Sequence, residues 1–132
     1  PASIRGALDA LGADRLRHGF RAVEEPALVE ELRERAIVLD VCPISNVRTG
    51  AVPSLGEHPL RELATAGVHC SISTDDPAMF DTDLTRDHDA ARSLGVTAEA
   101  AYEAGVLGAL CDDETREQLR ATGEAFDWRR VT

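Results

Sequence analysis

Long apolar runs, clusters of basic residues and paired cysteines are all missing from this sequence of 132 residues. No apolar stretch approaches the roughly 18 residues of a membrane-spanning helix. Its 24 acidic and 14 basic residues give a net charge of −10, which argues against binding to nucleic-acid phosphates or to anionic lipid. The first residues include no initiator methionine and have neither the charged start nor the apolar core of a signal peptide. We therefore expect no nucleic-acid partner and no membrane partner.

Cysteine is scarce, and the three that are present, Cys42, Cys70 and Cys111, are far apart. Without any Cys-x-x-Cys pair, a zinc site made of cysteines is excluded and a disulfide framework is disfavoured. Each thiol is then most simply a small buried apolar group in a reducing compartment, and the cytoplasm is the expected location. A composition of 43% hydrophobic and 29% charged residues is typical of a globular protein.

Three short apolar runs predict β-strands, at residues 14–19, 37–42 and 68–73. The second run is almost unbroken in its hydrophobicity, as in strands that helices cover on the outside. Helical segments separate the runs, and such spacing favours right-handed crossovers and a parallel sheet. Because three strands are few for a complete α/β domain, we expect the sheet by itself to expose its edges and its inner face.

Helices are predicted around the strands and through the last third of the chain. Pro26 stands at a first helical position, and Leu28 and Leu32 form the buried stripe of the helix that it begins. Segment 43–56 is rich in Pro, Ser, Asn and Gly and predicts a loop. Further helices are expected from Pro59 to a stop at Gly67 and at 83–94, 97–110 and 113–122. The helix at 97–110 is rich in Ala and Gly, which suits close packing.

Polar residues gather where each predicted strand ends. His18 follows the first strand, residues 42–46 follow the second, and Asp75 and Asp76 follow the third. The carboxyl ends of parallel strands form the rim on which α/β proteins place ligands and catalytic groups. An imidazole and two carboxylates at such a rim suit a metal site or acid–base chemistry.

Structural roles explain the same residues taken one by one. A lone His18 at a strand end is most often a hydrogen-bonded structural residue. Asp75 and Asp76 are suited to capping the amides of a following helix. Among the other polar residues we expect a helix-entry role for His58, no ligand role for His69 or His88, and a solvated face made of Asp81, Asp83, Asp87 and Asp89.

Several separated motifs, taken together and in order, favour a functional role for these residues over a structural one. They are Arg-Leu-Arg-His-Gly at 15–19, Cys-Pro-Ile-Ser-Asn at 42–46 with Thr49-Gly50, His58-Pro59, Ala-Gly-Val at 66–68, and Ser-Thr-Asp-Asp-Pro at 73–77 with Phe80. In order and spacing they resemble the adenosine deaminase family of the amidohydrolase superfamily. The resemblance extends from about Pro1 to Gly95, and the helical tail also fits the C-terminal end of that family.

The resemblance implies an α/β fold that is the C-terminal part of a (β/α)₈ TIM barrel. Residues 1–132 would supply strands six to eight and the terminal helices of a single metal-dependent deaminase domain. The expected reaction is the hydrolytic deamination of a 6-aminopurine such as adenosine, adenine or aminodeoxyfutalosine, with release of ammonia. In the family, the residue matching Asp75 is a zinc ligand, the one matching Asp76 hydrogen-bonds the purine, and the one matching His18 assists the attacking water. Zinc lowers the pKa of its bound water toward ~7, which explains its use in this chemistry.

Two family features are missing, and one residue departs from the family pattern. Neither the His-x-His pair nor the His-Ala-Gly-Glu motif, which supply the other zinc ligands and a proton-shuttling Glu, is present. A catalytic zinc needs about three protein ligands, so the N-terminal part of the barrel is an expected partner. Arg17 stands where the family usually has Gly.

Two alternatives remain open at this point. The chain could be a catalytically silent half-barrel that acts as an interaction module, or one half of a split enzyme. It could also be a small α/β protein that uses His18 and Asp75 for unrelated acid–base work. Asp75 by itself would equally suit iron, manganese or no metal.

Overall fold

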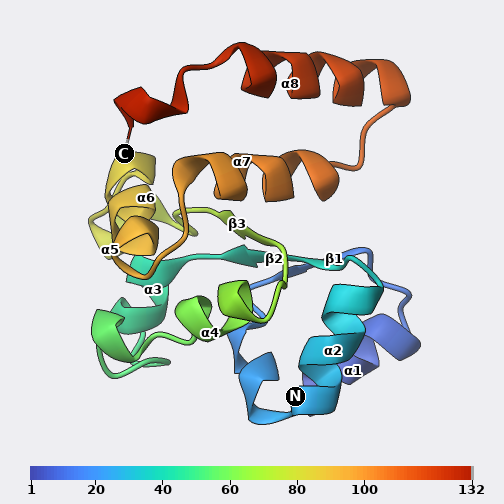
Figure 1. Ribbon diagram of the computed structural model, residues 1–132. Helices are drawn as coiled ribbons and strands as arrows, with labels where there is room; N and C mark the ends of the chain where they lie inside the picture. Colours follow the sequence, from blue (N-terminus) through green and yellow to red (C-terminus); the bar gives the residue numbers. More distant parts are fainter. Residues whose placement is uncertain (132) are drawn as a thin grey trace.

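The computed structural model describes residues 1–131 and places a three-stranded parallel sheet between two groups of helices (Figure 1). The strands are β1 (Arg15–Arg17), β2 (Val38–Val41) and β3 (Cys70–Ile72), in the spatial order β1-β2-β3. Leu39 at the centre of β2 pairs with Leu16 on one side and with Cys70 on the other. The predicted α/β class with three parallel strands is therefore confirmed.

The helices and 3₁₀ turns occupy most of the remaining chain. They are α1 (Ala2–Asp9), η1 (Phe20–Glu24), α2 (Pro26–Glu34), α3 (Pro43–Arg48), η2 (Leu55–Glu57), α4 (Leu60–Thr65), α5 (Pro77–Phe80), α6 (Leu84–Ser93), α7 (Ala98–Leu107), α8 (Asp113–Ala125) and η3 (Trp128–Arg130). Pro26 begins α2 as predicted, and the three helices expected after residue 83 are present as α6, α7 and α8. Among residues 1–131, none of the helices has the length and hydropathy of a bilayer span.

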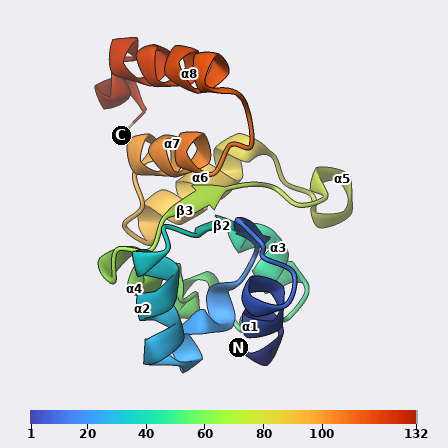
Figure 2. The same cartoon turned by 90° about the vertical axis from the view of Figure 1, so that its right-hand side faces the viewer.

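Helices α1, α2 and α4 lie on one side of the sheet (Figure 2), and much of the main hydrophobic core packs between them and the strands. Leu28 and Leu32 lie one helical turn apart on α2 and, like Leu39 of β2, are completely buried. Leu60 and Leu63 of α4 close the same cluster. Burial of each leucine contributes about 1.5–3 kcal/mol relative to exposure, so this cluster holds the helices against the sheet.

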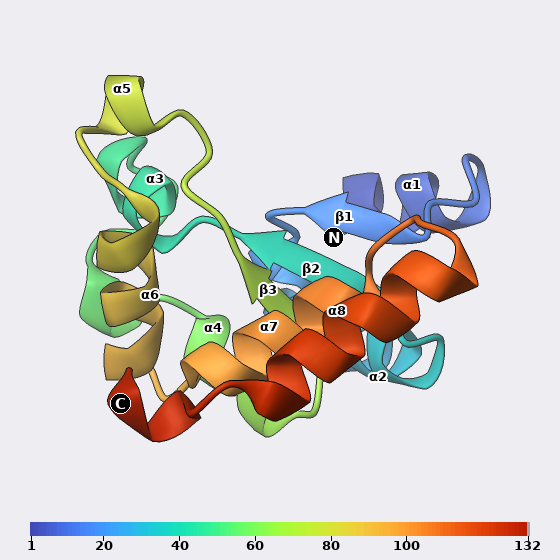
Figure 3. The ribbon, with the colours of Figure 1, turned by 90° about the horizontal axis from the view of Figure 1, so that it is seen from above.

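The opposite face of the sheet is covered over β2 and β3 by α7, with α8 stacked beyond it (Figure 3). A Cβ added to Gly108, just after α7, would lie 2.9 Å from Cβ of Val38. The end of α7 can therefore approach β2 closely because glycine has no side chain. Val38 and Ser71 are 1% and 4% exposed. The expectation of a bare inner face is therefore wrong over these two strands, because the small residues of 97–110 allow a helix to cover it. On β1, by contrast, Arg17 is exposed.

Two further expectations are corrected by a contact between α3 and α6. Segment 43–56 is not only loop, because α3 forms immediately after β2. Asp87 is not on a solvated face: its carboxylate is fully buried and accepts a hydrogen bond from the Ile44 amide at 3.0 Å. Ile44 is the second residue of α3, and its amide has no acceptor inside the helix. A residue distant in sequence thus caps a helix that local composition did not predict.

Candidate functional site

His18 and Asp75 come together where β1 and β3 end. Nε2 of His18 lies 3.7 Å from Oδ2 of Asp75, and both side chains are about one-third exposed. The backbone of both is left-handed, with φ of 61° and 62°, which costs an L-residue on the order of 1–3 kcal/mol. Gly19 continues the turn at φ 68°, where an added Cβ would meet the Leu39 side chain at 2.8 Å. The predicted convergence of an imidazole and a carboxylate is present.

The carboxylate of Asp75 is oriented by a residue of α3. The Ser45 hydroxyl, 1% exposed, donates to Oδ2 of Asp75 at 2.7 Å. Nη1 of Arg17 lies 3.6 Å from the other oxygen. The hydrogen bond and the ion pair together orient the Asp75 side chain, as polar neighbours commonly orient carboxylates that ligate metal ions.

Arg17 connects this carboxylate to a second one beneath it. Asp40 is 7% exposed, and its two oxygens lie 3.1 Å from Nη2 of Arg15 and 3.3 Å from Nη2 of Arg17. The Ser71 hydroxyl also donates to Asp40, at 3.0 Å. Sequence reasoning assigned no role to Asp40, although a lone charge in a buried apolar strand requires partners. The arginine that replaces the usual glycine is therefore one of the two cations that compensate Asp40.

A second network reaches His18 from the opposite side. Nδ2 of Asn46 lies 3.0 Å from Nδ1 of His18, and Oδ1 of Asn46 lies 3.0 Å from Nε2 of His58. His58 also accepts from the Leu60 amide, so its predicted role at a helix entry is confirmed. Its contact with Asn46 was not predicted. Burial lowers the pKa of His58 to about 4, which keeps its imidazole neutral.

Asp76 engages the helix that follows it. It is exposed, and its Oδ1 accepts from the Met79 amide at 2.8 Å as the N-cap of α5. The capping alternative is thus confirmed for Asp76, and its role in binding substrate stays a prediction. Asp75 receives its hydrogen bond from the Ser45 side chain, as described above, and Asp76 is the residue that caps α5.

The metal-binding capacity of the chain by itself is limited. Asp75 offers a carboxylate oxygen and His18 an imidazole nitrogen, both donor types that zinc accepts. Within residues 1–131, however, no cluster of three or more His, Cys, Asp or Glu side chains could hold a metal ion. Asp75 and His18 are therefore suited to form part of a zinc site, and the other ligands of such a site have to come from outside the described residues.

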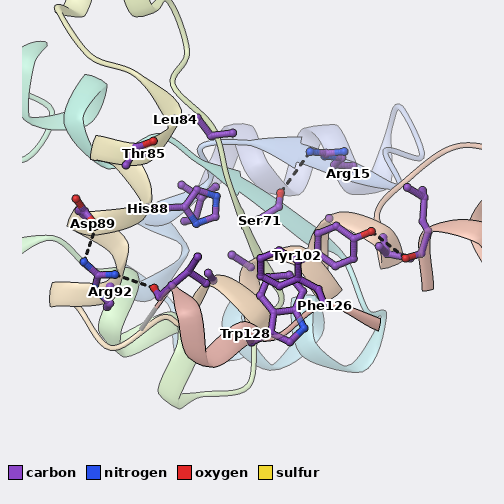
Figure 4. Close-up of a pocket in the computed structure, with 17 residues that line it drawn as sticks. Arg15, Ser71, Leu84, Thr85, His88, Asp89, Arg92, Tyr102, Phe126 and Trp128 are labelled. Carbon is purple, nitrogen blue, oxygen red and sulfur yellow. Dashed lines mark hydrogen bonds and ion pairs between the residues drawn. The ribbon is translucent and has the colours of Figure 1, made fainter. Parts of the chain in front are cut away.

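A cavity of about 680 Å³ lies elsewhere, between α6, α7 and the C-terminal helices (Figure 4). His18 and Asp75 do not line it. The polar atoms of its two largest aromatic side chains are already engaged: the Tyr102 hydroxyl donates to the Leu119 carbonyl and the Trp128 indole to the Gly123 carbonyl. Its walls are mainly apolar, and it carries none of the groups predicted to act in chemistry.

Comparison with known proteins gives one consistent answer. The family model described as adenosine deaminase matches residues 1–123. The aminodeoxyfutalosine deaminase of Acidothermus cellulolyticus is 52% identical over 131 residues, which are 99% of this chain and 37% of that protein. A crystal structure of an adenine deaminase from Arthrobacter aurescens superposes with a TM-score of 0.87 and 30% identity, over 98% of this chain and 41% of that one.

A further structure, an amidohydrolase from Burkholderia ambifaria with bound Zn, gives a TM-score of 0.87 at 26% identity, over 98% of this chain and 37% of that one. The chain thus spans about two-fifths of the length of the proteins that it matches. The family match covers almost all of the chain, including the motifs that end each strand. The chain belongs to the adenosine deaminase family.

Proposed function

We propose that residues 1–132 form the C-terminal part of one (β/α)₈ deaminase barrel, contributing strands six to eight and the terminal helices. The proposal is supported by the parallel order β1-β2-β3 and by a match that covers only about two-fifths of each relative. Both outer strands of this sheet are edges on which neighbouring barrel strands would pair. The N-terminal part of the barrel is the required partner, and we expect the complete protein in the cytoplasm.

The complete barrel is proposed to catalyse the hydrolytic deamination of a 6-aminopurine with release of ammonia. The observation that carries this proposal is the placement of His18 beside Asp75, 3.7 Å apart at the carboxyl edge of the sheet. Relatives that match this chain include an aminodeoxyfutalosine deaminase and an adenine deaminase, so these two compounds are the first candidate substrates.

Asp75 is proposed as this chain's ligand to zinc. Its donor chemistry fits, and the Ser45 hydrogen bond holds the carboxylate in its orientation. When bound, zinc would supply Lewis acidity at the rim and so promote the attack of water on the purine. His18, directed at the same point, would stabilise the attacking oxygen, and Asp76 would hydrogen-bond the purine once it gives up its capping contact.

The test uses the full-length protein loaded with zinc. Ammonia release is measured with adenine, adenosine and aminodeoxyfutalosine, and a complete lack of turnover on all three would refute the proposal. Asp75→Ala is expected to abolish metal retention, whereas His18→Ala should lower turnover on the order of 10²–10⁴-fold with zinc retained. The exposed His69 provides a matched control, because His69→Ala should change neither property. Equal zinc loss in the Asp75 and His18 variants would contradict the assigned roles.

A second candidate is a half-barrel without catalysis of its own, acting as an interaction module or as one half of a split enzyme. It is favoured by the observation that residues 1–131 contain no group of three potential metal ligands. The intact mass of the purified protein separates the two candidates. A species well above 14.2 kDa supports the single-chain enzyme, a second co-purifying chain supports the split enzyme, and a lone 14.2 kDa species supports the module.

A further inference from the structure

We propose that His58 and Asn46 are positioning residues that fix which ring nitrogen of His18 carries its proton, an inference that rests on the function proposed above. Both residues are buried, at 3% exposed each, and their side chains bond to each other, to His18 and to the Leu60 amide. They form a chain of three hydrogen bonds that begins at a backbone amide and ends at His18.

The direction of the chain is set at its first bond. The Leu60 amide lies 3.0 Å from Nδ1 of His58, and because a backbone N–H only donates, Nδ1 must accept. A neutral His58 then carries its proton on Nε2. Burial lowers the pKa of His58 to about 4, so the neutral form is the one present near pH 7. The Phe20 ring, with its centroid 5.4 Å from that of His58, contributes to this apolar environment.

The second bond orients the Asn46 side-chain amide. Nε2–H of His58 donates to Oδ1 of Asn46 at 3.0 Å, so the carbonyl oxygen of the amide faces His58 and its NH₂ group faces away. That NH₂ group lies 3.0 Å from Nδ1 of His18. Without His58 as a donor, the Asn46 amide could reverse and present its oxygen to His18 instead.

The third bond determines the tautomer of His18. An NH₂ group only donates, so Nδ1 of His18 must accept and the proton of the neutral ring lies on Nε2. Nε2 is the nitrogen directed at the site, 3.7 Å from Oδ2 of Asp75. His18 therefore presents an N–H donor to the reacting centre. In this state it stabilises an attacking oxygen by donating a hydrogen bond, and it does not remove a proton from that oxygen.

The tautomer is measured directly by ¹⁵N NMR of histidine-labelled, zinc-loaded full-length protein, with the His18 signals assigned by their loss in His18→Gln. In the wild type, Nε2 of His18 is expected to be the protonated nitrogen. Asn46→Asp is nearly isosteric but replaces the NH₂ donor with an acceptor, so it should place a proton on Nδ1 of His18. A wild-type His18 that carries its proton on Nδ1 overturns the proposal.

Activity supplies a second readout. Asn46→Asp and His58→Leu are each expected to lower kcat on the order of 10- to 100-fold, with KM and zinc content unchanged. His58→Gln keeps an N–H donor toward Asn46 and should recover part of the loss. The matched control is His69→Gln, at an exposed histidine, which should leave both the His18 signals and kcat as in the wild type. Unchanged kcat and an unchanged His18 tautomer in Asn46→Asp refute the positioning role.

The two proposals fail in different ways. If the protein deaminates no purine, the proposed function fails, whereas the wild-type NMR spectrum still reports the His18 tautomer. If deamination is observed but His18 is protonated on Nδ1, only the positioning role fails. If His58→Leu does not fold, Asn46→Asp and the wild-type spectrum decide the question.

Discussion

Asp87 holds α3 in place, and its removal gives the sharpest test of how the site is supported. Its fully buried carboxylate accepts from the Ile44 amide at 3.0 Å and from the Thr82 hydroxyl at 2.8 Å. The residue before α3, Cys42, makes no side-chain cap, so Asp87 provides the acceptor that this helix N-terminus otherwise lacks. A carboxylate at the first turn also interacts favourably with the helix dipole.

The expected cost can be worked from these two bonds. Hydrogen bonds to a charged group contribute about 1.5–3 kcal/mol each, so Asp87→Ala should lower the free energy of unfolding by roughly 3–6 kcal/mol. Asp87→Asn keeps an oxygen for the Ile44 amide, and its NH₂ group can donate to the Thr82 hydroxyl. The asparagine variant should therefore lose only about 1–2 kcal/mol.

The assay is urea unfolding of the full-length protein, followed by circular dichroism, at constant zinc concentration. Asp89→Ala is the matched control, because Asp89 is an exposed neighbour that pairs only with Arg92 in the described contacts, and it should change stability by less than about 0.5 kcal/mol. Since α3 also carries Ser45 and Asn46, Asp87→Ala should lower turnover as well. An alanine variant that is as stable as the Asp89 control would refute the capping argument.

Burial and close packing determine three other measurable properties. Iodoacetamide at pH 8 should alkylate the partly exposed Cys111 well before Cys42, because burial raises the pKa of the Cys42 thiol to about 11; equal rates in peptide mass spectrometry would contradict this. Below pH 6.5 the unfolded chain binds a proton at His58 that the folded chain excludes, since burial lowers the pKa of His58 to about 4. The free energy of unfolding should therefore decrease as the pH is lowered, by about 3 kcal/mol once the pH is below 4. Superimposable pH–stability curves for wild type and His58→Gln would rule this out. Gly108→Ala places a Cβ 2.9 Å from Cβ of Val38 and should cost about 1–3 kcal/mol in urea unfolding, whereas an unchanged midpoint would show that α7 adjusts freely.

Local sequence patterns were sufficient to predict the elements of the sheet and its rim. The almost unbroken apolar run at 37–42 is a buried strand because both faces of β2 are covered, and its hydrophobicity was sufficient to predict this. Pro26 marks the start of α2 because its fixed φ suits a helix, whereas its missing N–H and its ring are tolerated only in the first turn. His18 and Asp75 were predicted to converge, since the carboxyl ends of parallel strands lie at one edge of the sheet.

Contacts between residues distant in sequence were decided only by the tertiary structure. Asp87 is one of four aspartates in the charged segment 81–89, and nothing local distinguishes it from the three exposed ones; its burial depends on an amide 43 positions earlier. The hydrogen bonds that join His18 to Asn46 and Ser45 to Asp75 span 28 and 30 positions. Composition and periodicity describe which face of an element is apolar, but not which polar atoms meet across the fold. The sequence by itself therefore determined the strands, the longer helices, the rim and the family, whereas packing determined α3 and how the groups at the rim are held.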